Sequence, residues 1–409
     1  MKYILVIADG CADDPVPELD GRTPLEYAST PNMDALASAG VMGNVENCPA
    51  GLPAGSDTAI LSIFGCDPLR CYTGRAPIEA AARGIALEPG DAAFRCNLVA
   101  FEDGNRPLEE KRLLSHNAGV IEAEDALPII RALCGEPRFQ RALRDAGMTI
   151  YQTASFRQYA VQQGADIRGL TLIPPHDHLG EAAGPLMPSG CEDAVVLGGL
   201  IRLAHELLDH HPLNERRRAL GKLPANGIWF WAEGSAVSLP GFTETYRMSG
   251  GVVSAVPICQ GIASLVGLDT VSVPGATGEL ETNYEGKAEA ALRILETHDF
   301  TAVHVEAPDE CTHNGDLQGK IRSLEWIDGR VLAPLLKGIR QNGWEFRLLL
   351  LSDHKTLTST RGHAHGAVPF CLYDSRRDRK TGSTFCEKAG EAGLSVDRGT
   401  KLMGMLFEK

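Results

Sequence analysis

The most constraining feature of the sequence is the mainly apolar run Arg347–Leu351, which ends in Ser352-Asp353-His354. Such a run, followed at once by polar residues, is typical of a buried parallel strand. Ligands of open α/β sheets bind at the carboxyl ends of these strands, so Asp353 and His354 are candidate site residues. A capping aspartate beside a surface histidine would give the same pattern, and the pair alone does not decide between the two.

Two further strands end in polar residues of the same kind. Tyr3–Ala8 is followed by Asp9, a candidate metal ligand that could also form a simple Asx-turn. Phe300–Val305 precedes Glu-Ala-Pro-Asp309-Glu-Cys-Thr-His313. Asp309 and His313 are four residues apart, so one helical turn places both on the same face, although a surface turn is the alternative.

A serine stands at the predicted start of a helix. Prolines and glycines in CPAGLPAG form a tight loop, and Ala59, Ile60 and Ile63 follow Ser56 at helical spacing. A hydroxyl at this position lies near the positive end of the helix dipole and near free backbone N–H groups, which favours an alkoxide and a phosphate bound to it. The alternative is that Ser56 is only a helix cap.

Together the strand ends supply three carboxylates, three imidazoles and one hydroxyl. The candidate ligands are Asp9, Ser56, Asp309, His313, Asp353, His354 and His363. This mixture of nitrogen and oxygen ligands predicts two divalent metal ions, with Mn²⁺ first and Zn²⁺, Co²⁺ or Mg²⁺ as alternatives. Paired metals of this kind stabilise the attacking and leaving oxygens of a phosphoryl transfer. His365 lies two residues from His363 and is an alternative ligand.

Arginines replace the metal-type residues in the middle of the chain. Strand, turn and helix alternate at both ends, which predicts an α/β, doubly wound domain interrupted by an inserted second α/β (α+β) domain. We expect residues 1–80 and 246–409 to form the metal-binding domain and 81–245 to form the inserted substrate-binding or lid domain. The candidate substrate contacts are Arg75, Arg95, Asn97, Arg157, His176 and Asp177.

Composition excludes several classes of partner. The net charge of −14 argues against nucleic acid and anionic membranes, and no apolar run is long enough to span a bilayer. The apolar start of the chain is short and reaches Asp9, so it predicts a strand and no signal peptide. The eleven cysteines contain no CxxC pair, which predicts free thiols and a cytoplasmic protein. The oligomeric state stays open.

The sequence resembles the archaeal-type cofactor-independent (2,3-bisphosphoglycerate-independent) phosphoglycerate mutases of the alkaline phosphatase superfamily. The resembling segments run almost from end to end: ADG at 8–10, TPNMDALA at 30–37, AGSDTAILS at 54–62, YTGRAPIEA at 72–80, AFRCNLV at 93–99, PPHD at 174–177, LPANGIWFW at 223–231, VPGATGELETNY at 273–284, VHVEAPDECTH at 303–313, SDH at 352–354 and HAHGAVPF at 363–370.

The resemblance implies a role for each matched residue. Ser56 would accept the phosphoryl group of 3-phosphoglycerate, and the retained glycerate would take it back on its 2-hydroxyl. Asp309, His313 and His363 would hold one metal, and Asp9, Ser56, Asp353 and His354 the other. Retention of the intermediate requires a lid, which is the role expected of the inserted domain. Arg75, Arg95 and Arg157 would bind carboxylate and phosphate.

Three positions depart from the family pattern as the resemblance gives it. Lysine is usual where Ser249 stands, and aspartate and histidine are usual where Ser115 and Val120 stand. All three changes fall on the expected substrate side. The same subfamily includes relatives proposed to phosphorylate homoserine. The alternative function is therefore a related, homoserine kinase-like phosphotransferase, or a phosphatase, acting on another small molecule.

Overall fold

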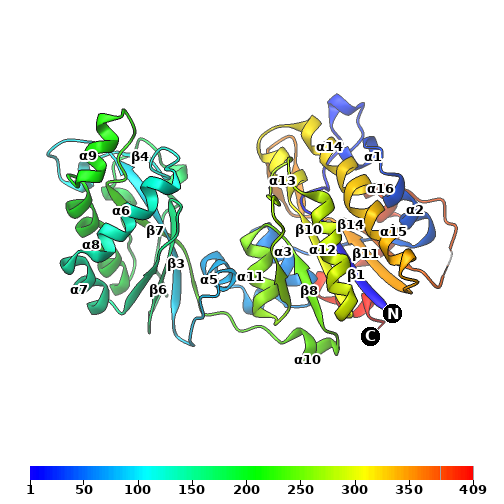
Figure 1. The fold of residues 1–409 in the computed structure, drawn as a ribbon. Helices are drawn as coiled ribbons and strands as arrows, with labels where there is room; N and C mark the ends of the chain where they lie inside the picture. Colours follow the sequence, from blue (N-terminus) through cyan, green and yellow to red (C-terminus); the bar gives the residue numbers. More distant parts are fainter. Residues whose placement is uncertain (378, 409) are drawn as a thin grey trace. The chain divides into compact units, whose positions relative to one another are not determined.

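The computed structural model describes residues 1–377 and 379–408 and divides into two compact units (Figure 1). The first unit comprises Met1–Tyr72, Ala81–Arg83 and Ser238–Lys409, and the second comprises Thr73–Ala80 and Gly84–Val237. The short segment Thr73–Ala80, which carries Arg75, thus groups with the second unit, whereas the sequence analysis places it in the first. The use of the second unit for substrate binding stays a prediction.

The first unit is built on an eight-stranded sheet with the order β15-β2-β14-β11-β1-β10-β8-β9. Its strands are β1 (Lys2–Ala8), β2 (Val41–Val45), β8 (Gly250–Val253), β9 (Asp269–Val271), β10 (Phe300–Val305), β11 (Phe346–Leu351), β14 (Val368–Asp374) and β15 (Leu394–Val396). Strands β11, β1, β10, β8 and β9 run parallel, whereas β14 is antiparallel to both β11 and β2. The predicted α/β fold is confirmed.

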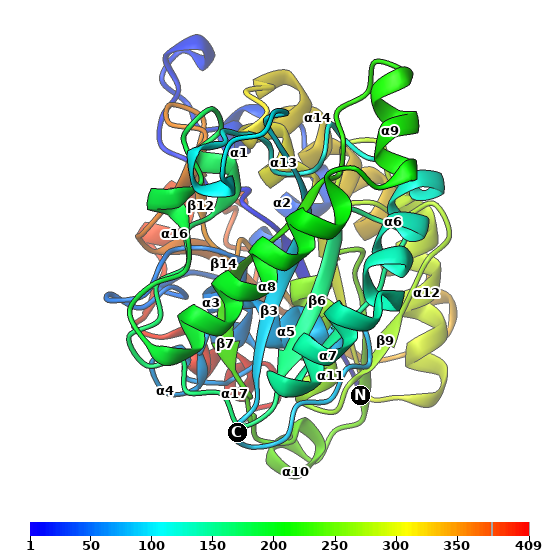
Figure 2. The ribbon, with the colours of Figure 1, turned by 90° about the vertical axis from the view of Figure 1, so that its left-hand side faces the viewer.

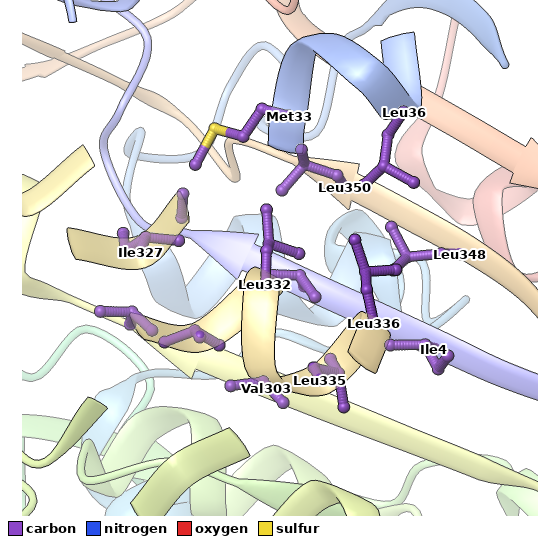
Figure 3. Packing of buried hydrophobic residues seen from close by; sticks show 14 of the residues in the cluster. Ile4, Met33, Leu36, Val303, Ile327, Leu332, Leu335, Leu336, Leu348 and Leu350 are labelled. Atoms are coloured by element: carbon purple, nitrogen blue, oxygen red, sulfur yellow. The ribbon is translucent and has the colours of Figure 1, made fainter. Parts of the chain in front are cut away.

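Helices cover both faces of this sheet. They are α1 (Pro24–Tyr27), α2 (Pro31–Ala39), α3 (Ser56–Ile63), α4 (Pro68–Cys71), α10 (Phe242–Tyr246), α11 (Pro257–Leu265), α12 (Tyr284–Thr297), α13 (Ala307–His313), α14 (Leu317–Trp326), α15 (Ala333–Gln341), α16 (Glu387–Glu391) and α17 (Leu402–Leu406). On one face, Ile4, Val303 and Leu348 pack in a core with residues of α2, α12 and α15 (Figure 3). On the other face the Phe300 ring stacks on Phe242. The alternation follows from the two-residue period of a strand.

The register of the central strands brings their ends to one edge. Ile7 of β1 pairs with Leu351 of β11, and Ala8 pairs with Val305 of β10. The polar residues that follow these strands therefore leave the sheet side by side. A hairpin of β12 (Lys355–Leu357) and β13 (Gly362–Ala364) comes after β11.

The second unit is a five-stranded antiparallel sheet with most of its helices on one face (Figures 1 and 2). Its elements are α5 (Arg75–Ala82), β3 (Ala92–Phe101), β4 (Leu113–Ser115), α6 (Ala123–Gly135), α7 (Pro137–Asp145), β5 (Met148–Tyr151), β6 (Arg157–Gln162), α8 (Glu192–Leu208), α9 (Pro212–Ala219) and β7 (Gly227–Ser235). Phe94, Cys96 and Leu98 of β3 belong to the core that includes residues of α6, α7 and α8. Arg95 and Asn97 alternate with them and point to the opposite face.

All eleven cysteines are free, and burial raises the pKa of several of them, that of Cys371 to about 12. The predicted free thiols are confirmed. In the part of the chain that the structure describes, no helix has both the length and the apolar character needed to cross a membrane.

Leu348 offers a direct test of the packing of the central sheet. Its side chain is fully buried in β11, so Leu348→Ala is expected to lower the free energy of unfolding of the first unit by about 2–5 kcal/mol through lost burial and a residual cavity. Denaturant titration followed by circular dichroism measures the change. Leu69→Ala, at a side chain 60% exposed in the same unit, is the control. Equal effects of the two substitutions would contradict the packing.

Candidate active site

Three carboxylates converge at the carboxyl edge of the parallel strands. Asp9 follows β1, Asp353 follows β11, and Asp309 lies in the first turn of α13 after β10; all three are buried. Asp353 Oδ1 accepts hydrogen bonds from the backbone N–H groups of Gly10 (3.0 Å) and His354 (2.9 Å). These bonds fix the orientation of Asp353 and leave its second oxygen directed to the site.

Ser56 is the first residue of α3 and lies beside these acids. Its Oγ is 3.2 Å from Asp9 Oδ2 and 3.1 Å from His354 Nε2. The helix places the backbone N–H groups of its first turn at the same end, where they suit an anion. The structure thus joins the predicted serine to two of the predicted metal ligands.

Asp309, His313 and His363 form the second part of the site. His313 Nε2 is 3.1 Å from Asp309 Oδ2 and 3.0 Å from His363 Nε2. The helical turn predicted for Asp309 and His313 is present as α13. His365 lies apart from this group, with Nδ1 3.3 Å from the Cys48 carbonyl.

Hydrogen bonds to carbonyl groups fix the orientation of two of these imidazoles. His313 Nδ1 lies 2.8 Å from the Arg361 carbonyl, and His363 Nδ1 lies 3.2 Å from the Ala54 carbonyl. Because a carbonyl oxygen can only accept, each Nδ1 carries the proton. The Nε2 atoms of both rings are therefore available as metal ligands, as is common for histidines supported in this way.

His304, which the sequence analysis does not identify, supports Asp9. Its Nε2 is 2.7 Å from Asp9 Oδ2, and its Nδ1 is 3.0 Å from Ser254 Oγ, which in turn accepts the Val256 N–H. Burial lowers the pKa of His304 to about 4, so the ring is neutral. It donates from Nε2 to Asp9 and accepts the Ser254 hydroxyl proton at Nδ1. The only signal in the sequence is a histidine within the apolar strand FTAVHV.

Thr356 is the second residue that the sequence analysis does not identify. Its hydroxyl contacts both Asp309 and His354. Gly10, in the left-handed conformation with φ of 60°, packs against it: a Cβ there would lie 2.4 Å from Thr356 Oγ1. Glycine is therefore required at the end of β1 both for backbone conformation and for space.

The pKa values of the site residues depend on burial and on the charges of their neighbours. Burial and the negative charges of Asp353 and Asp309 raise the pKa of Asp9 well above its ordinary value. Burial also acts on Asp309, but hydrogen bonds from His313 and His363 outweigh it and hold its pKa well below the usual range. The hydrogen bond to Asp309 raises the pKa of His313 to about 9. The raised pKa of Asp9 thus follows from its burial beside two other acids.

The donor set fits divalent metal ions. Asp9, Asp309 and His354 offer ligand atoms within 4.8 Å of one another, and so do Asp309, His313 and His363. Asp9 Oδ1 and Asp353 Oδ2 are buried and have no hydrogen-bond partner among the described residues. Buried, unpartnered carboxylate oxygens are unfavourable unless they bind a cation. Imidazole and carboxylate together suit Mn²⁺, Zn²⁺ or Co²⁺.

In the second unit, the three predicted arginines gather around one acid. Arg95 pairs with Glu79 through Nε at 2.8 Å and through a second, short contact from Nη2. Burial of Glu79 is outweighed by the hydrogen bond from Arg95 and by the charges of Arg95, Arg157 and Arg75, which lower its pKa.

Arg157 is the arginine of this group whose Nε has no hydrogen-bond partner among the described residues. It opens β6, and burial and the neighbouring Arg95 lower its pKa. His116 lies nearby; its Nδ1 has no partner in the described part of the chain, and its ring is 6.0 Å from that of His176. Burial, then His176 and Arg157, lower the pKa of His116. This face of the second unit has the donors and charge to bind an anion.

The remaining predicted contacts of the second unit have other partners or lie at the surface. Asn97 is buried; its Nδ2 donates to the His116 carbonyl (3.0 Å) and its Oδ1 accepts from Trp231 Nε1 (3.1 Å). It therefore orients neighbours of the arginine group. His176 and Asp177 are exposed and lie 3.6 Å from each other.

The three departures from the family pattern lie in polar or exposed settings. Ser249 bonds to Asp299 through its backbone N–H and its hydroxyl, both to Oδ2. Ser115 Oγ accepts from the Gly119 N–H at 2.8 Å. Val120 is 75% exposed and has a φ of 54°, a conformation that a β-branched residue rarely adopts.

Comparison with known proteins identifies the family. Over 410 residues the chain is 40% identical to the 2,3-bisphosphoglycerate-independent phosphoglycerate mutase of Methanosarcina barkeri (strain Fusaro / DSM 804), with 100% of both chains covered. The chain belongs to the 2,3-bisphosphoglycerate-independent phosphoglycerate mutase family. Residues 37–214 also match the description of this family. The resemblance stated from the motifs is confirmed.

Solved structures agree with the family. The PH0037 protein from Pyrococcus horikoshii is similar with a TM-score of 0.81 and 30% identity, over 100% of this chain and 97% of that one. The cofactor-independent phosphoglycerate mutase from Thermoplasma acidophilum DSM 1728 has a TM-score of 0.67 and 27% identity, over 100% and 99% of the two chains. Both solved structures thus share the fold over the whole length of this chain.

The fit of the site to metal predicts stabilisation by Mn²⁺. After chelation, added Mn²⁺ at a hundred times its dissociation constant is expected to stabilise the protein by about 2.7 kcal/mol for each site filled. Thermal unfolding measures the gain. Asp9→Asn is expected to reduce it, whereas Asp20→Asn, at a side chain 94% exposed, keeps it. A wild-type melting temperature that does not respond to Mn²⁺ would contradict the metal site.

Proposed function

We propose that this protein is a metal-dependent phosphoglycerate mutase that interconverts 3-phosphoglycerate and 2-phosphoglycerate, without 2,3-bisphosphoglycerate, through a phosphoserine at Ser56. The observation that carries the proposal is the position of Ser56 Oγ, 3.2 Å from Asp9 Oδ2 and 3.1 Å from His354 Nε2 at the start of α3. A serine in such a setting is an activated nucleophile rather than a helix cap. The identity of the substrate is inferred from the names of the relatives.

The residues of the first unit have distinct roles in this proposal. We assign Asp309, His313 and His363 to one divalent ion and Asp9, Ser56, Asp353 and His354 to a second, with Mn²⁺ as the preferred metal. When bound, the ions supply positive charge for the phosphoryl oxygens and favour the serine alkoxide. His354 Nε2 and Asp9 Oδ2 are placed to accept the hydrogen bond of the Ser56 hydroxyl. The first N–H groups of α3 are oriented toward the incoming phosphoryl group.

The transfer balances as two displacements at phosphorus. In the first, Ser56 Oγ forms a bond to phosphorus and the bond to the 3-oxygen of the substrate breaks, which leaves glycerate and phosphoserine. In the second, the 2-hydroxyl oxygen of glycerate attacks the phosphoserine and Ser56 is released. The 2-hydroxyl loses one proton and the 3-oxygen gains one, so the number of protons is unchanged over the two steps. Water must be kept away between the steps, because hydrolysis of the phosphoserine would release phosphate.

The arginine group of the second unit, together with the neighbouring His176 and Asp177, is proposed to contribute to substrate binding. The charges of Arg75, Arg95 and Arg157 all act on Glu79, and guanidinium groups suit a carboxylate or phosphate. Arg157 is the strongest candidate for direct contact because its Nε lacks a partner among the described residues. Arg95 is held by Glu79 and lies with its guanidinium 4.6 Å from the centre of the Trp231 ring. Asn97 is assigned to positioning.

We place the enzyme in the cytoplasm, in glycolysis and gluconeogenesis. Eleven free cysteines fit a reducing compartment, and the interconversion of the two phosphoglycerates belongs to these pathways.

Ser56→Ala tests the nucleophile. The substitution removes the group that accepts phosphate, so kcat is expected to fall by at least about three orders of magnitude. Mn²⁺ binding, measured by calorimetry, should persist through the remaining ligands. Ser62→Ala, in the same helix and away from the strand ends, should keep the activity. Turnover of Ser56→Ala at the wild-type rate would contradict the phosphoserine.

Arg157→Ala tests the proposed substrate contact. Loss of hydrogen bonds to a charged group removes about 1.5–3 kcal/mol, so kcat/KM for 3-phosphoglycerate is expected to fall by about 10- to 150-fold, with the Mn²⁺ affinity unchanged. Arg168→Ala is the matched control, because Arg168 lies in the same unit with its side chain 89% exposed. Unchanged kinetics of Arg157→Ala would remove this residue from the site.

A further inference from the structure

Thr356 links the two groups of proposed metal ligands. It lies in β12, two residues after His354, and is fully buried. Its hydroxyl oxygen is 2.6 Å from Asp309 Oδ1 and 3.1 Å from His354 Nδ1. Asp309 belongs to the ligand group of His313 and His363, whereas His354 belongs to the group around Ser56. Thr356 itself is not one of the proposed metal ligands.

The direction of each hydrogen bond follows from the number of protons available. A hydroxyl group donates once, and an ionised carboxylate can only accept, so the Thr356 proton lies toward Asp309. The His354 ring must then donate from Nδ1 to the hydroxyl oxygen. In the neutral ring, Nε2 then carries no proton; it faces Ser56 Oγ at 3.1 Å and Asp9 Oδ1 at 3.3 Å. One hydroxyl thus determines the tautomer of His354 and the orientation of Asp309.

The surroundings of Thr356 prevent the hydroxyl from moving away. Its backbone N–H donates to the Ala12 carbonyl at 3.1 Å, and its carbonyl accepts from Lys320 Nζ at 2.7 Å. Lys320 is fully buried and also bonds to Asp13 Oδ2 at 2.8 Å. On the remaining side, the backbone of Gly10 leaves no space even for a methyl group.

We infer that Thr356 is a positioning residue that couples the two metal sites: its single hydroxyl prepares one ligand of each, so that both sites depend on it. The inference rests on the proposed function, because it assumes that both ligand groups bind metal. It predicts that loss of the hydroxyl weakens both metal-binding steps, although Thr356 ligates neither ion. Hydrogen bonds to metal ligands of this kind affect metal affinity by about 10- to 100-fold.

Calorimetric titration of the chelated full-length protein with Mn²⁺ tests the inference. Thr356→Val keeps the shape of the side chain and removes the hydroxyl, so both dissociation constants are expected to rise by about 10- to 100-fold. Thr356→Ser restores the hydroxyl and should restore both affinities. Thr358→Val is the matched control in the same segment, since the Thr358 hydroxyl donates to Asp13 (2.6 Å) and touches no proposed ligand. Circular dichroism checks the fold, and Thr356→Ala replaces Thr356→Val if the latter does not fold.

The outcomes separate this inference from the proposed function. Two Mn²⁺ steps with wild-type affinity in the valine or alanine variant would contradict the inference and leave the proposed function intact. Weakening of one step alone would contradict the coupling of the two sites. A wild-type protein that takes up no Mn²⁺ would contradict both the proposed function and the inference. Rescue by serine distinguishes the hydroxyl from a general loss of packing.

Discussion

The active site depends on the burial of Asp9, Asp309 and Asp353 at one edge of the central sheet. The parallel pairing of β1 with β10 and β11 forces these acids together, and burial makes their mutual repulsion costly. Backbone N–H groups, a neutral His304 and the Thr356 hydroxyl orient the carboxylates, but none of these partners brings a full positive charge. The arrangement fits a divalent cation, and Ser56, the proposed nucleophile, lies beside the same acids.

The second unit presents positively charged side chains, in contrast to the buried acids of the first unit. Its sheet buries apolar side chains beneath helices on one face and presents arginines on the other. Glu79 holds Arg95 in place and partly offsets the charge of Arg75 and Arg157. The result is a group of guanidiniums on one face of the sheet. In the proposed function this group helps to bind a phosphorylated acid, although the net charge of the chain is −14.

The parts of the site that were predictable from the sequence are those marked by a change of pattern. Asp9, Asp353 and His354 each follow an apolar strand, and the spacing of Asp309 and His313 already indicates one helical turn. His304 and Thr356 were not predictable in this way. His304 lies inside a strand, where only the pairing with β1 brings it to Asp9, and Thr356 depends on the path of the chain after His354. Glu79 lies within an apolar helix segment, and its role depends on the arginines of β3 and β6.

The same reasoning explains where individual residues took on other roles. Asn97 lies two residues after Arg95, so both side chains are on the same face of β3. The sequence gives Asn97 as a candidate substrate contact, but it does not reveal that Trp231 and the His116 carbonyl bond to its amide. The segment that carries Arg75 groups with the second unit because α5 packs on the arginine-bearing face of β3 through Ala76, Ala80 and Ala93. Such contacts between distant segments leave no recognisable pattern in the local sequence.

Phosphorus NMR of the Mn²⁺-loaded protein with 3-phosphoglycerate, in the absence of 2,3-bisphosphoglycerate, tests the central claim most directly. The account predicts a growing 2-phosphoglycerate signal that approaches equilibrium with little free phosphate. Free phosphate alone would mean that Ser56 accepts the phosphoryl group but glycerate is not retained, which contradicts the mutase. An unchanged 3-phosphoglycerate signal would contradict phosphoryl transfer from this substrate altogether.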